Sequence, residues 1–573
     1  MPEKAFSVCI KDSVFIDPAC GSGNFLTETY LSLRRLENMI IADQTKETLG
    51  QTAMRGLDAD FAGIKVSISQ FYGIEINDFA VTVAKTALWI AESQMMKETE
   101  EIISIPLNFL PLKTNAYIME GNALRTDWET IIPKSKLNYI MGNPPFLGGM
   151  CMSEIQKAEI RSIFPNVTGA GEFDYVTGWY CKATEYISNQ NIHCAFVSTN
   201  SICQGSQVIT FWKYLIEHYH VHIDFAYTPF VWNSEAKSQA KVHCVIVGFS
   251  RTISYSKNCR LFSSADSYKQ CEQISPYLTD SPVAFVESRS TPLCNVPKMH
   301  FGSMPRDGGG FILTAEEKSD LLQSEPLAAQ WIRPYVGATE FLNSKERYCL
   351  WLVGADPGEI NKCPTVKKRV EFVRKTRASS KAAGTRKFAS TPTLFCQIAQ
   401  PDSTYIIVPK TSSGKRRYIP LGFMDKDTIA SDLVFLIPNA GLYEFGVLMS
   451  NVHNSWMRLV AGRLKSDYRY SKDIVYNNFV WCTPSPEQKK RIEQTAQGIL
   501  DARKLYPKST LANLYDDVLM PPELRKAHQA NDRAVMDAYG FTKGTAARTS
   551  ESACVAELMK RYQQLLSAQQ REN

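Results

Sequence analysis

The sequence predicts an α/β protein in which a doubly wound, mostly parallel sheet is followed by a mixed α/β domain and a helical C-terminal tail. Through the first 285 residues, short apolar runs that read as strands alternate with runs of helical periodicity. From about residue 286, Pro, Gly and Ser interrupt short apolar runs, and from about residue 485 apolar residues recur at helical spacing. The expected domains are residues 1–285, 286–484 and 485–573, the last of which is interpreted as a packing or partner-binding tail.

Length and composition indicate a soluble protein with several domains. A chain of 573 residues is too long for one hydrophobic core, and its 44% hydrophobic and 21% charged content is ordinary for globular proteins. Fifteen cysteines without a Cys-x-x-Cys pair or a secretory signal are typical of reduced thiols, which indicates a cytoplasmic location. No apolar run approaches the roughly 18 residues that span a bilayer, so no membrane association is expected.

The turn after the first predicted strand suggests a cofactor site. Residues 13–16 read as a strand and residues 25–41 as a helix. Between them stands the run Asp17-Pro18-Ala19-Cys20-Gly21-Ser22-Gly23. Gly21 and Gly23 allow the backbone to approach a ligand closely, and the helix start offers free N–H groups. A strand, a glycine turn and a helix start together form the usual cradle of an adenosyl cofactor.

The second strand is expected to end in a carboxylate for the ribose hydroxyls of that cofactor. The run at 71–76 closes on Glu75 and Ile76, and a helix is expected at 78–95. The spacing from the first strand exceeds the about 20 residues of the dinucleotide fingerprint, so residues 42–70 are read as an insertion.

The third predicted strand, at 116–119, leads into Asn122. In such folds a side chain at this point reaches the adenine edge of the cofactor, although Asn122 could equally cap a helix. Strands that end one after another in polar groups are expected where a site lies at the carboxyl edge of a parallel sheet.

The fourth predicted strand, at 137–142, delivers the run Asn143-Pro144-Pro145-Phe146. Proline has no N–H, so this backbone offers rigidly held carbonyl acceptors, to which Asn143 adds a side-chain oxygen and Phe146 a flat apolar face. Such acceptors beside a stacking ring suit the exocyclic amine of a planar base. They favour a pyramidal nitrogen whose lone pair can attack a methyl sulfonium. The alternative is an ordinary Asn-Pro turn.

The rest of the first domain is expected to complete the sheet. The predicted elements are a helix at 172–187, a strand at 194–199, a helix at 211–218, a strand at 221–227 and an antiparallel strand at 242–249. His218, His220 and His222 alternate as metal ligands on a strand do, but no Cys or carboxylate completes a set. A half-exposed strand edge is the preferred interpretation, and no metal is expected.

Basic residues gather in three places in the second domain. They are Lys367, Lys368, Arg369, Arg374, Lys375, Arg377, Lys381, Arg386 and Lys387; then Lys415, Arg416 and Arg417; then Arg463, Lys465 and Arg469, with Asp467 among them. Lys and Arg neutralise DNA phosphates, whereas mixed acidic and basic groups distinguish base edges. We therefore expect residues 367–369 to anchor DNA and residues 463–469 to read its sequence, the alternative being a solvated basic surface.

These motifs resemble those of the MmeI-type restriction–modification enzymes, also called type IIL, and the resemblance covers nearly the whole chain. The matching segments are 17–25, 73–77, 142–146, 333–337, 347–352, 462–470 and 475–479. The resemblance implies a Rossmann-like, class I S-adenosylmethionine-dependent methyltransferase sheet, then a target-recognition domain and a helical tail. It implies N6 methylation of a flipped adenine in double-stranded DNA. In that reading Asp17 and the glycine turn hold the methionine end of the cofactor.

The family order begins with a nuclease and a spacer, which are absent from this chain. We therefore expect that a separate N-terminal spacer or nuclease polypeptide completes the system, and that the chain alone methylates slowly or not at all. Two rival functions remain. One is a non-catalytic DNA-binding remnant or subunit. The other is a protein-glutamine methyltransferase, but such enzymes lack a basic domain after the catalytic one.

Overall fold

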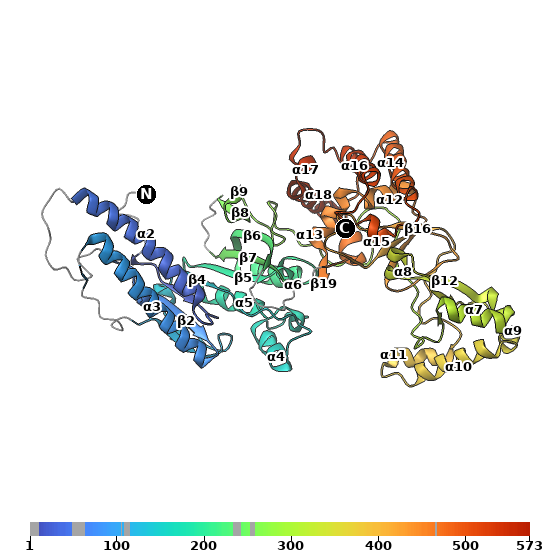
Figure 1. Ribbon diagram of the computed structural model, residues 1–573, viewed down its shortest axis with the longest axis horizontal. Helices are drawn as coiled ribbons and strands as arrows, with labels where there is room; N and C mark the ends of the chain where they lie inside the picture. The colour runs from blue at the N-terminus through green and yellow to red at the C-terminus, as the bar shows by residue number, and fades with distance from the viewer. Residues whose placement is uncertain are drawn as a thin grey trace. The chain divides into compact units, whose positions relative to one another are not determined.

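The computed structural model describes residues 11–48, 64–104, 106–107, 115–188, 190–232, 242–251, 258–464 and 467–572. The chain divides into two compact units. The first comprises Met1–Cys203 and Gln207–Phe285, and the second comprises Gln204–Ser206 and Val286–Asn573. Figure 1 shows strands interleaved with helices along the first unit, coloured from blue to green. Among the described residues, no helix is long and apolar enough to cross a membrane.

In the described residues, the first unit is built on a nine-stranded sheet in the order β3-β2-β1-β4-β5-β7-β6-β8-β9. The strands are β1 (Phe15–Asp17), β2 (Phe71–Glu75), β3 (Tyr117–Glu120), β4 (Tyr139–Gly142), β5 (His193–Thr199), β6 (His222–Trp232), β7 (Val242–Ser250), β8 (Cys259–Ser264) and β9 (Ser267–Cys271). Neighbours from β3 to β5 pair in parallel, and β7 runs antiparallel between β5 and β6. The predicted doubly wound sheet and its antiparallel strand are therefore confirmed.

A row of aromatic rings fixes the register of the three central strands. Phe15 of β1 pairs in register with Phe71 of β2 and with Tyr139 of β4. Its ring stacks on both of theirs, with centroids 5.2 and 5.1 Å apart. Offset stacking adds to the burial of apolar area, and a one-residue slip would turn these rings to the other face of the sheet.

The first two long helices extend further than predicted. Helices α2 (Asn24–Thr48) and α3 (Asp78–Ile103) pack against each other and lie side by side in Figure 1. The end of α3 is rich in Glu and Lys, which favour helix even where the apolar periodicity weakens. The helix stops at Ser104, which adopts a left-handed backbone with φ of 56°.

Three short helices follow, and all three differ from prediction, the last because it begins at Gln207 and not at residue 211. They are α4 (Glu154–Ile163), α5 (Thr177–Tyr186) and α6 (Gln207–Lys213), the last continued by a π-helical turn at Tyr214–His218. Helix α4 was not predicted, nor were β8 and β9. Helix α5 begins five residues later than residue 172, because Asp174 and its neighbours form hydrogen-bonded turns instead.

The predicted strand edge of three histidines is wrong. His218 ends the π-helical turn, and His220 has a φ of 57°, which lies outside the strand region. Only His222 belongs to a strand, at the start of β6. The described residues contain no group of three or more His, Cys, Asp or Glu that could hold a metal ion.

The second unit contains three small sheets within the residues described. The strands are β10 (His300–Phe301), β18 (Val434–Pro438), β14 (Tyr405–Pro409) and β16 (Gly422–Met424); β11 (Ile312–Leu313), β13 (Tyr348–Leu350), β12 (Ile332–Val336) and β17 (Ile429–Ala430); and β15 (Thr411–Ser412), β20 (Asp467–Arg469) and β19 (Gly462–Leu464), each set in spatial order. This confirms the mixed α/β character predicted for this part of the chain.

Helices cover these sheets and form the tail. The helices that precede the tail are α7 (Ala315–Ser324), α8 (Ala338–Asn343), α9 (Pro357–Asn361), α10 (Pro364–Ala378), α11 (Ala383–Arg386), α12 (Leu442–Leu448) and α13 (Asn451–Val460). The tail contains α14 (Pro486–Lys504), α15 (Leu511–Leu514), α16 (Pro522–Ala538), α17 (Ala546–Thr549) and α18 (Glu551–Glu572). The predicted helical tail is therefore present.

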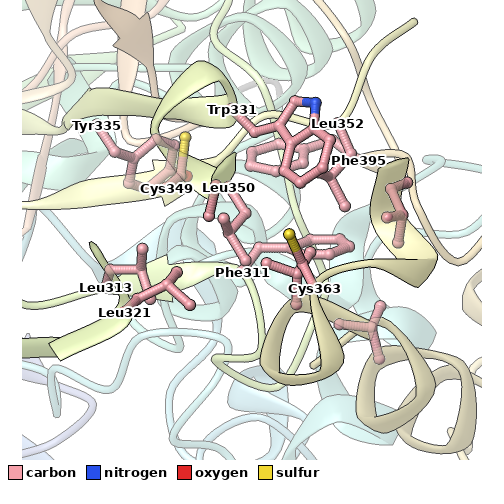
Figure 2. Packing of buried hydrophobic residues seen from close by; sticks show 14 of the residues in the cluster. Phe311, Leu313, Leu321, Trp331, Tyr335, Cys349, Leu350, Leu352, Cys363 and Phe395 are labelled. Atoms are coloured by element: carbon pink, nitrogen blue, oxygen red, sulfur yellow. The ribbon is translucent and has the colours of Figure 1, made fainter. Parts of the chain in front are cut away.

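Helix α10 packs on a core that is visible in Figure 2. Phe311 stacks on Phe395 at 5.8 Å, and Trp351 meets the edge of Phe395 at 5.1 Å. Cys363, at the start of α10, lies beside the ring of Phe311 in Figure 2, and Val373 belongs to the same buried cluster. One face of α10 is therefore buried against this core.

Arg377 of α10 does not contribute to the basic, DNA-binding surface predicted from the cluster at 367–387. Its side chain is fully buried. The guanidinium donates hydrogen bonds of 2.7–3.2 Å to the carbonyl oxygens of Pro305, Arg306, Phe388, Thr391 and Leu394. Because it ties three loop segments to the helix, Arg377 is an architectural residue.

Candidate functional site

The glycine turn after β1 leaves open space at its tip. Gly21 has a φ of +53°, and no heavy atom would lie within 4 Å of a Cβ placed there. Gly23 has a φ of +82°, and a Cβ would come within 2.9 Å of the Ala84 Cβ on α3. The first glycine therefore keeps the turn accessible to a ligand, and the second allows α3 to approach.

The glycine turn also receives a hydrogen bond from a residue that was not predicted from the sequence. The indole N–H of Trp179, on α5, donates a 2.9 Å hydrogen bond to the carbonyl oxygen of Pro18. Trp179 is buried, so this bond is shielded from water. Nothing in the local sequence links Trp179 to Pro18, because they are 161 positions apart.

Asp17 is a buried carboxyl group with one oxygen unused. Its Oδ1 accepts a 2.9 Å hydrogen bond from the Ala19 N–H, whereas Oδ2 is buried without a partner. Burial, reinforced by Glu75, raises the pKa of Asp17 to about 7 despite the bond from Ala19. A Cβ at residue 142 would lie 2.4 Å from Asp17 Oδ1, so Gly142 is required for this arrangement.

Glu75, at the end of β2, is oriented by the turn beside it. Its Oε2 accepts from the Gly21 N–H at 2.9 Å, and its Oε1 accepts from the Asn77 N–H at 3.0 Å. Ile76 follows with a side chain that is 69% exposed. An oriented carboxylate beside an exposed apolar side chain and an open glycine turn fits a ribose and an adenine ring. The carboxylate, the apolar side chain and the open turn at this edge therefore suit the adenosyl cofactor predicted from the sequence.

Cys20 lies inside this edge but has no accessible thiol. Its side chain is buried and would touch a Cβ placed at Gly73, at 2.9 Å from Sγ. Burial, together with Asp17 and Glu75, raises its pKa far above that of a free thiol. Cys20 therefore contributes packing under the turn, with Ala19 supplying the backbone N–H to Asp17.

Asn122 is already engaged with protein groups. Its Oδ1 accepts from the Leu124 N–H at 2.9 Å, as in a turn cap, and its Nδ2 donates to Glu159 Oε1 at 3.0 Å. Glu159, from α4, also binds Arg125 at 2.7 Å and the Tyr175 hydroxyl at 2.6 Å. The structure therefore shows Asn122 capping a turn, where the sequence left open a helix cap. A contact with adenine at Asn122 stays a prediction.

The run after β4 carries a second buried acceptor without a partner, Asn143 Oδ1. Pro144 is buried, Pro145 is exposed and Phe146 is half-buried. Because β4 is next to β1 in the sheet and Gly142 touches Asp17, the ends of these strands bring Asn143 close to the cofactor turn. The structure thus unites the two motifs that the sequence separates by more than a hundred residues.

Asp174 positions the segment that follows Phe146, and the sequence analysis gave it no role. Its Oδ1 accepts from the Leu147 N–H at 3.0 Å, and its Oδ2 accepts from the Thr199 hydroxyl at 2.9 Å. The Tyr175 N–H returns a 2.9 Å bond to the Leu147 carbonyl. The available signal was an Asp just before a helix, which is typical of a side chain that bonds backbone N–H groups.

The second and third basic clusters meet on one sheet of the second unit. Strand β15 precedes Lys415, Arg416 and Arg417, and it pairs with β20, which ends at Arg469. The Gly414 N–H donates to Asp467 Oδ1 at 3.3 Å, which ties the two segments together.

The side chain of Arg463, on β19, is restrained by a neighbouring tyrosine. Arg463 donates to the Tyr468 hydroxyl at 2.8 Å and lies 4.1 Å from the centre of that ring. Lys465 lies outside the described residues, whereas Arg469 is exposed. The predicted base-reading residues that can be placed are therefore on adjacent strands.

The first basic cluster is separate from that sheet. Lys367 and Lys368 on α10 are exposed. Arg369 instead donates to Glu317 at 2.7 Å and to the Gly310 carbonyl at 3.2 Å. The two lysines are therefore freer than Arg369 to meet a phosphate.

Comparison with known proteins assigns the family. Family models for the MmeI DNA-methyltransferase, target recognition and C-terminal domains match residues 4–263, 280–483 and 484–569. DNA methyltransferase A of Bacillus subtilis (strain 168) is 41% identical over 528 residues, which is 92% of this chain; the chain spans 59% of the length of that relative. A structure of the type IIL restriction–modification enzyme MmeI in complex with DNA is also similar. It is 41% identical with a TM-score of 0.80, and the match covers 99% of this chain and 74% of that one. The chain belongs to the MmeI family.

Proposed function

We propose that this chain transfers a methyl group from S-adenosylmethionine to N6 of an adenine in double-stranded DNA, as the modification enzyme of a restriction–modification system. The observation that supports this most strongly is the pair of buried, unpaired acceptors Asp17 Oδ2 and Asn143 Oδ1 at neighbouring strand ends. An unpaired buried acceptor costs free energy, so a ligand donor at these two neighbouring strand ends would complete their hydrogen bonding and lower that cost.

S-adenosylmethionine supplies an electrophilic methyl group to such a site. Asp17 and the glycine turn bind its methionine end, Glu75 receives the ribose hydroxyls, and Asn122 and Ile76 border the adenine. These roles follow from the order of the strand ends, with the open tip at Gly21 admitting the cofactor.

The target adenine is held by the run after β4. Flipping a base out of the duplex costs a few kcal/mol, which stacking on Phe146 offsets in part. Asn143 Oδ1 and the Pro144 carbonyl accept the two hydrogens of the amine, and Pro145 restricts the backbone between Pro144 and Phe146. Accepting both hydrogens keeps the lone pair pointed at the methyl group. Catalysis then requires positioning and oriented dipoles, without a metal or a covalent intermediate.

The second unit selects the site in this proposal. Arg463 on β19, Asp467 and Arg469 on β20, together with Lys465, would read base edges, and the turn at Lys415, Arg416 and Arg417 would follow the adjacent backbone. Lys367, Lys368 and Arg369 would contribute sequence-independent phosphate contacts.

Methylation maps test the proposal. Cells that lack related enzymes would express the wild-type chain, the Asn143→Ala variant or no added gene, and their DNA would be read by a method that reports methylated adenine. Because methyl groups persist in DNA, even the slow turnover expected of the chain alone should leave N6-methyladenine at one sequence motif with the wild type. None is expected with Asn143→Ala or without the gene. Methylation only of cytosine, or an unchanged adenine motif with Asn143→Ala, would contradict the assignment.

A further inference from the structure

The second unit contains a basic pocket outside the segments assigned above. A cavity of about 200 Å³ lies beside β10. Its lining includes Ser290, Lys298, His300, Phe301, Gln397 and Lys472, and none of its lining residues is acidic. A pocket with cations, neutral donors and one aromatic face is suited to an anion.

Two ammonium groups from different elements share one exposed ring in this wall. Lys410 Nζ lies 4.2 Å from the centre of the Phe301 ring, and Lys472 Nζ lies 5.6 Å from it. Phe301 is 38% exposed, and it packs on Phe435 across the β10–β18 pair at 5.1 Å. Cation–π attraction therefore holds both ammonium groups at this ring, and of the two, Lys472 lines the cavity.

The positive charge around this wall is only partly offset within the protein. Lys472 pairs with Asp473, but among the described residues no carboxylate lies within ion-pair distance of half-buried Lys410. Burial, with a smaller contribution from Arg469, lowers the pKa of Lys410 despite the opposing charge of Asp432, and burial with Lys472 and Lys298 lowers that of His300. An anion in the pocket would relieve this excess of positive charge.

The pocket adjoins the sheet proposed to read bases. Lys410 immediately precedes β15, and Lys472 follows β20 by three residues. The Tyr470 N–H donates to the Lys410 carbonyl at 2.8 Å, which fixes the spacing of the two segments. A duplex that lies along β19 and β20 therefore has its backbone near these lysines.

We propose that this pocket binds a phosphodiester of the DNA duplex and sets the register of the base-reading strands. The inference rests on the proposed function, since it requires that the second unit binds DNA. The contact carries no sequence information of its own, because phosphate contacts position a protein and base contacts specify the sequence.

The test uses the full chain with Lys472→Gln and Lys298→Gln, and with Lys489→Gln as a matched control. Lys489 also lies over an aromatic ring, 5.4 Å from the centre of Tyr443, but on α14 away from the pocket. The probe is a duplex carrying the methylated site, and binding is measured over a range of salt concentrations. Loss of one phosphate contact should reduce the slope of log K against log salt by about 0.9, with an unchanged methylation motif.

Duplexes with a neutral methylphosphonate at single positions locate the contact. One position should weaken binding of the wild type and of Lys489→Gln, and the same position should be silent in the pocket variants. Pocket variants that match the control in slope and in this scan would overturn the inference while the proposed function stands. Competition by inorganic phosphate without any slope change would also overturn it, in favour of a free-anion site. A wild-type chain that binds no duplex would remove both proposals.

Discussion

The strand-end site of the first unit and the basic surface of the second differ in how their polar groups are satisfied. At the strand ends, Asp17 Oδ2 and Asn143 Oδ1 are buried without partners. In the second unit, Arg369 and Arg463 already donate to protein groups, and Arg377 is fully enclosed. Two unpaired acceptors gathered at neighbouring strand ends support a ligand site there, whereas charge in a sequence does not by itself make a binding surface.

The largest expected effect concerns two arginines of α10, one buried and one exposed, and it is a change in stability. Arg377→Leu removes the donors of several buried carbonyl groups, so we expect the free energy of unfolding to fall by about 3 kcal/mol or more. Arg374→Leu, three residues earlier, loses only an exposed pair with Glu371 and should melt close to the wild type. Denaturant unfolding of both variants checks this. Equal stability of the two would show that burial of Arg377 contributes nothing.

The next prediction concerns the flipped base. Phe146→Ala should weaken binding of a duplex with an extruded or mismatched target adenine by about 1–3 kcal/mol, because the stacking face is lost. Phe146→Tyr keeps a π-face and should retain most of that affinity. The measurement is fluorescence of 2-aminopurine placed at the target, which reports extrusion. If Tyr and Ala are equally damaging, Phe146 serves packing and the proposed stacking is wrong.

A pH dependence follows from Asp17. Since its pKa in the fold, about 7, exceeds the ordinary value of 3.8, ionisation destabilises the cofactor-free chain as pH rises between these values. If the cofactor's ammonium group prefers the carboxylate, affinity for S-adenosylmethionine should fall about tenfold per pH unit below 7 and level off above.

Calorimetric titration of the wild type and of Asp17→Asn at several pH values measures this linkage. The variant should bind weakly at every pH and show no such slope. A wild-type affinity that is flat from pH 6 to pH 8 would contradict a role for the ionised carboxylate.

The smallest effects separate anchoring from reading in the second unit. Lys367→Gln and Lys368→Gln should weaken binding evenly across sequences and reduce the salt slope by about 0.9 for each lost phosphate contact. Substitutions at Lys465, Asp467 or Arg469 should instead change which sequence is methylated. Salt titrations check the anchoring lysines, and methylation maps check the base-reading residues. An unchanged motif in all three reading variants would contradict the assignment.

The site of the first unit could be predicted from the sequence because each motif stands at the end of a predicted strand, and the parallel order of the strands brings those ends together. The runs ending at Asp17, Glu75 and Asn143 each mark a strand end, and a parallel sheet gathers such ends on one edge. Trp179 and Asp174 were missed because their partners, Pro18 and Leu147, are distant in sequence.

The contacts made by the basic residues of the second unit could not be predicted from the sequence in this way. Nothing in the sequence distinguishes Arg377 from its exposed neighbours, since its burial depends on loops at 305–306 and 388–394 that pack over it. The pairing of β15 with β20 is likewise a long-range choice, and only the structure joins the clusters at 415–417 and 463–469. Charge clusters predicted a binding domain but not its surface.

The most direct test compares DNA binding with single-turnover methyl transfer for the wild type and Asn143→Ala, with radiolabelled S-adenosylmethionine and saturating enzyme. Asn143 Oδ1 is an acceptor that matters most as the amine becomes pyramidal, so the account predicts little change in Kd for DNA. It predicts a rate loss of about 2.7–4 kcal/mol, a hundredfold to a thousandfold, as for other preorganised transition-state contacts. Methyl transfer to adenine by Asn143→Ala at the wild-type rate would contradict it.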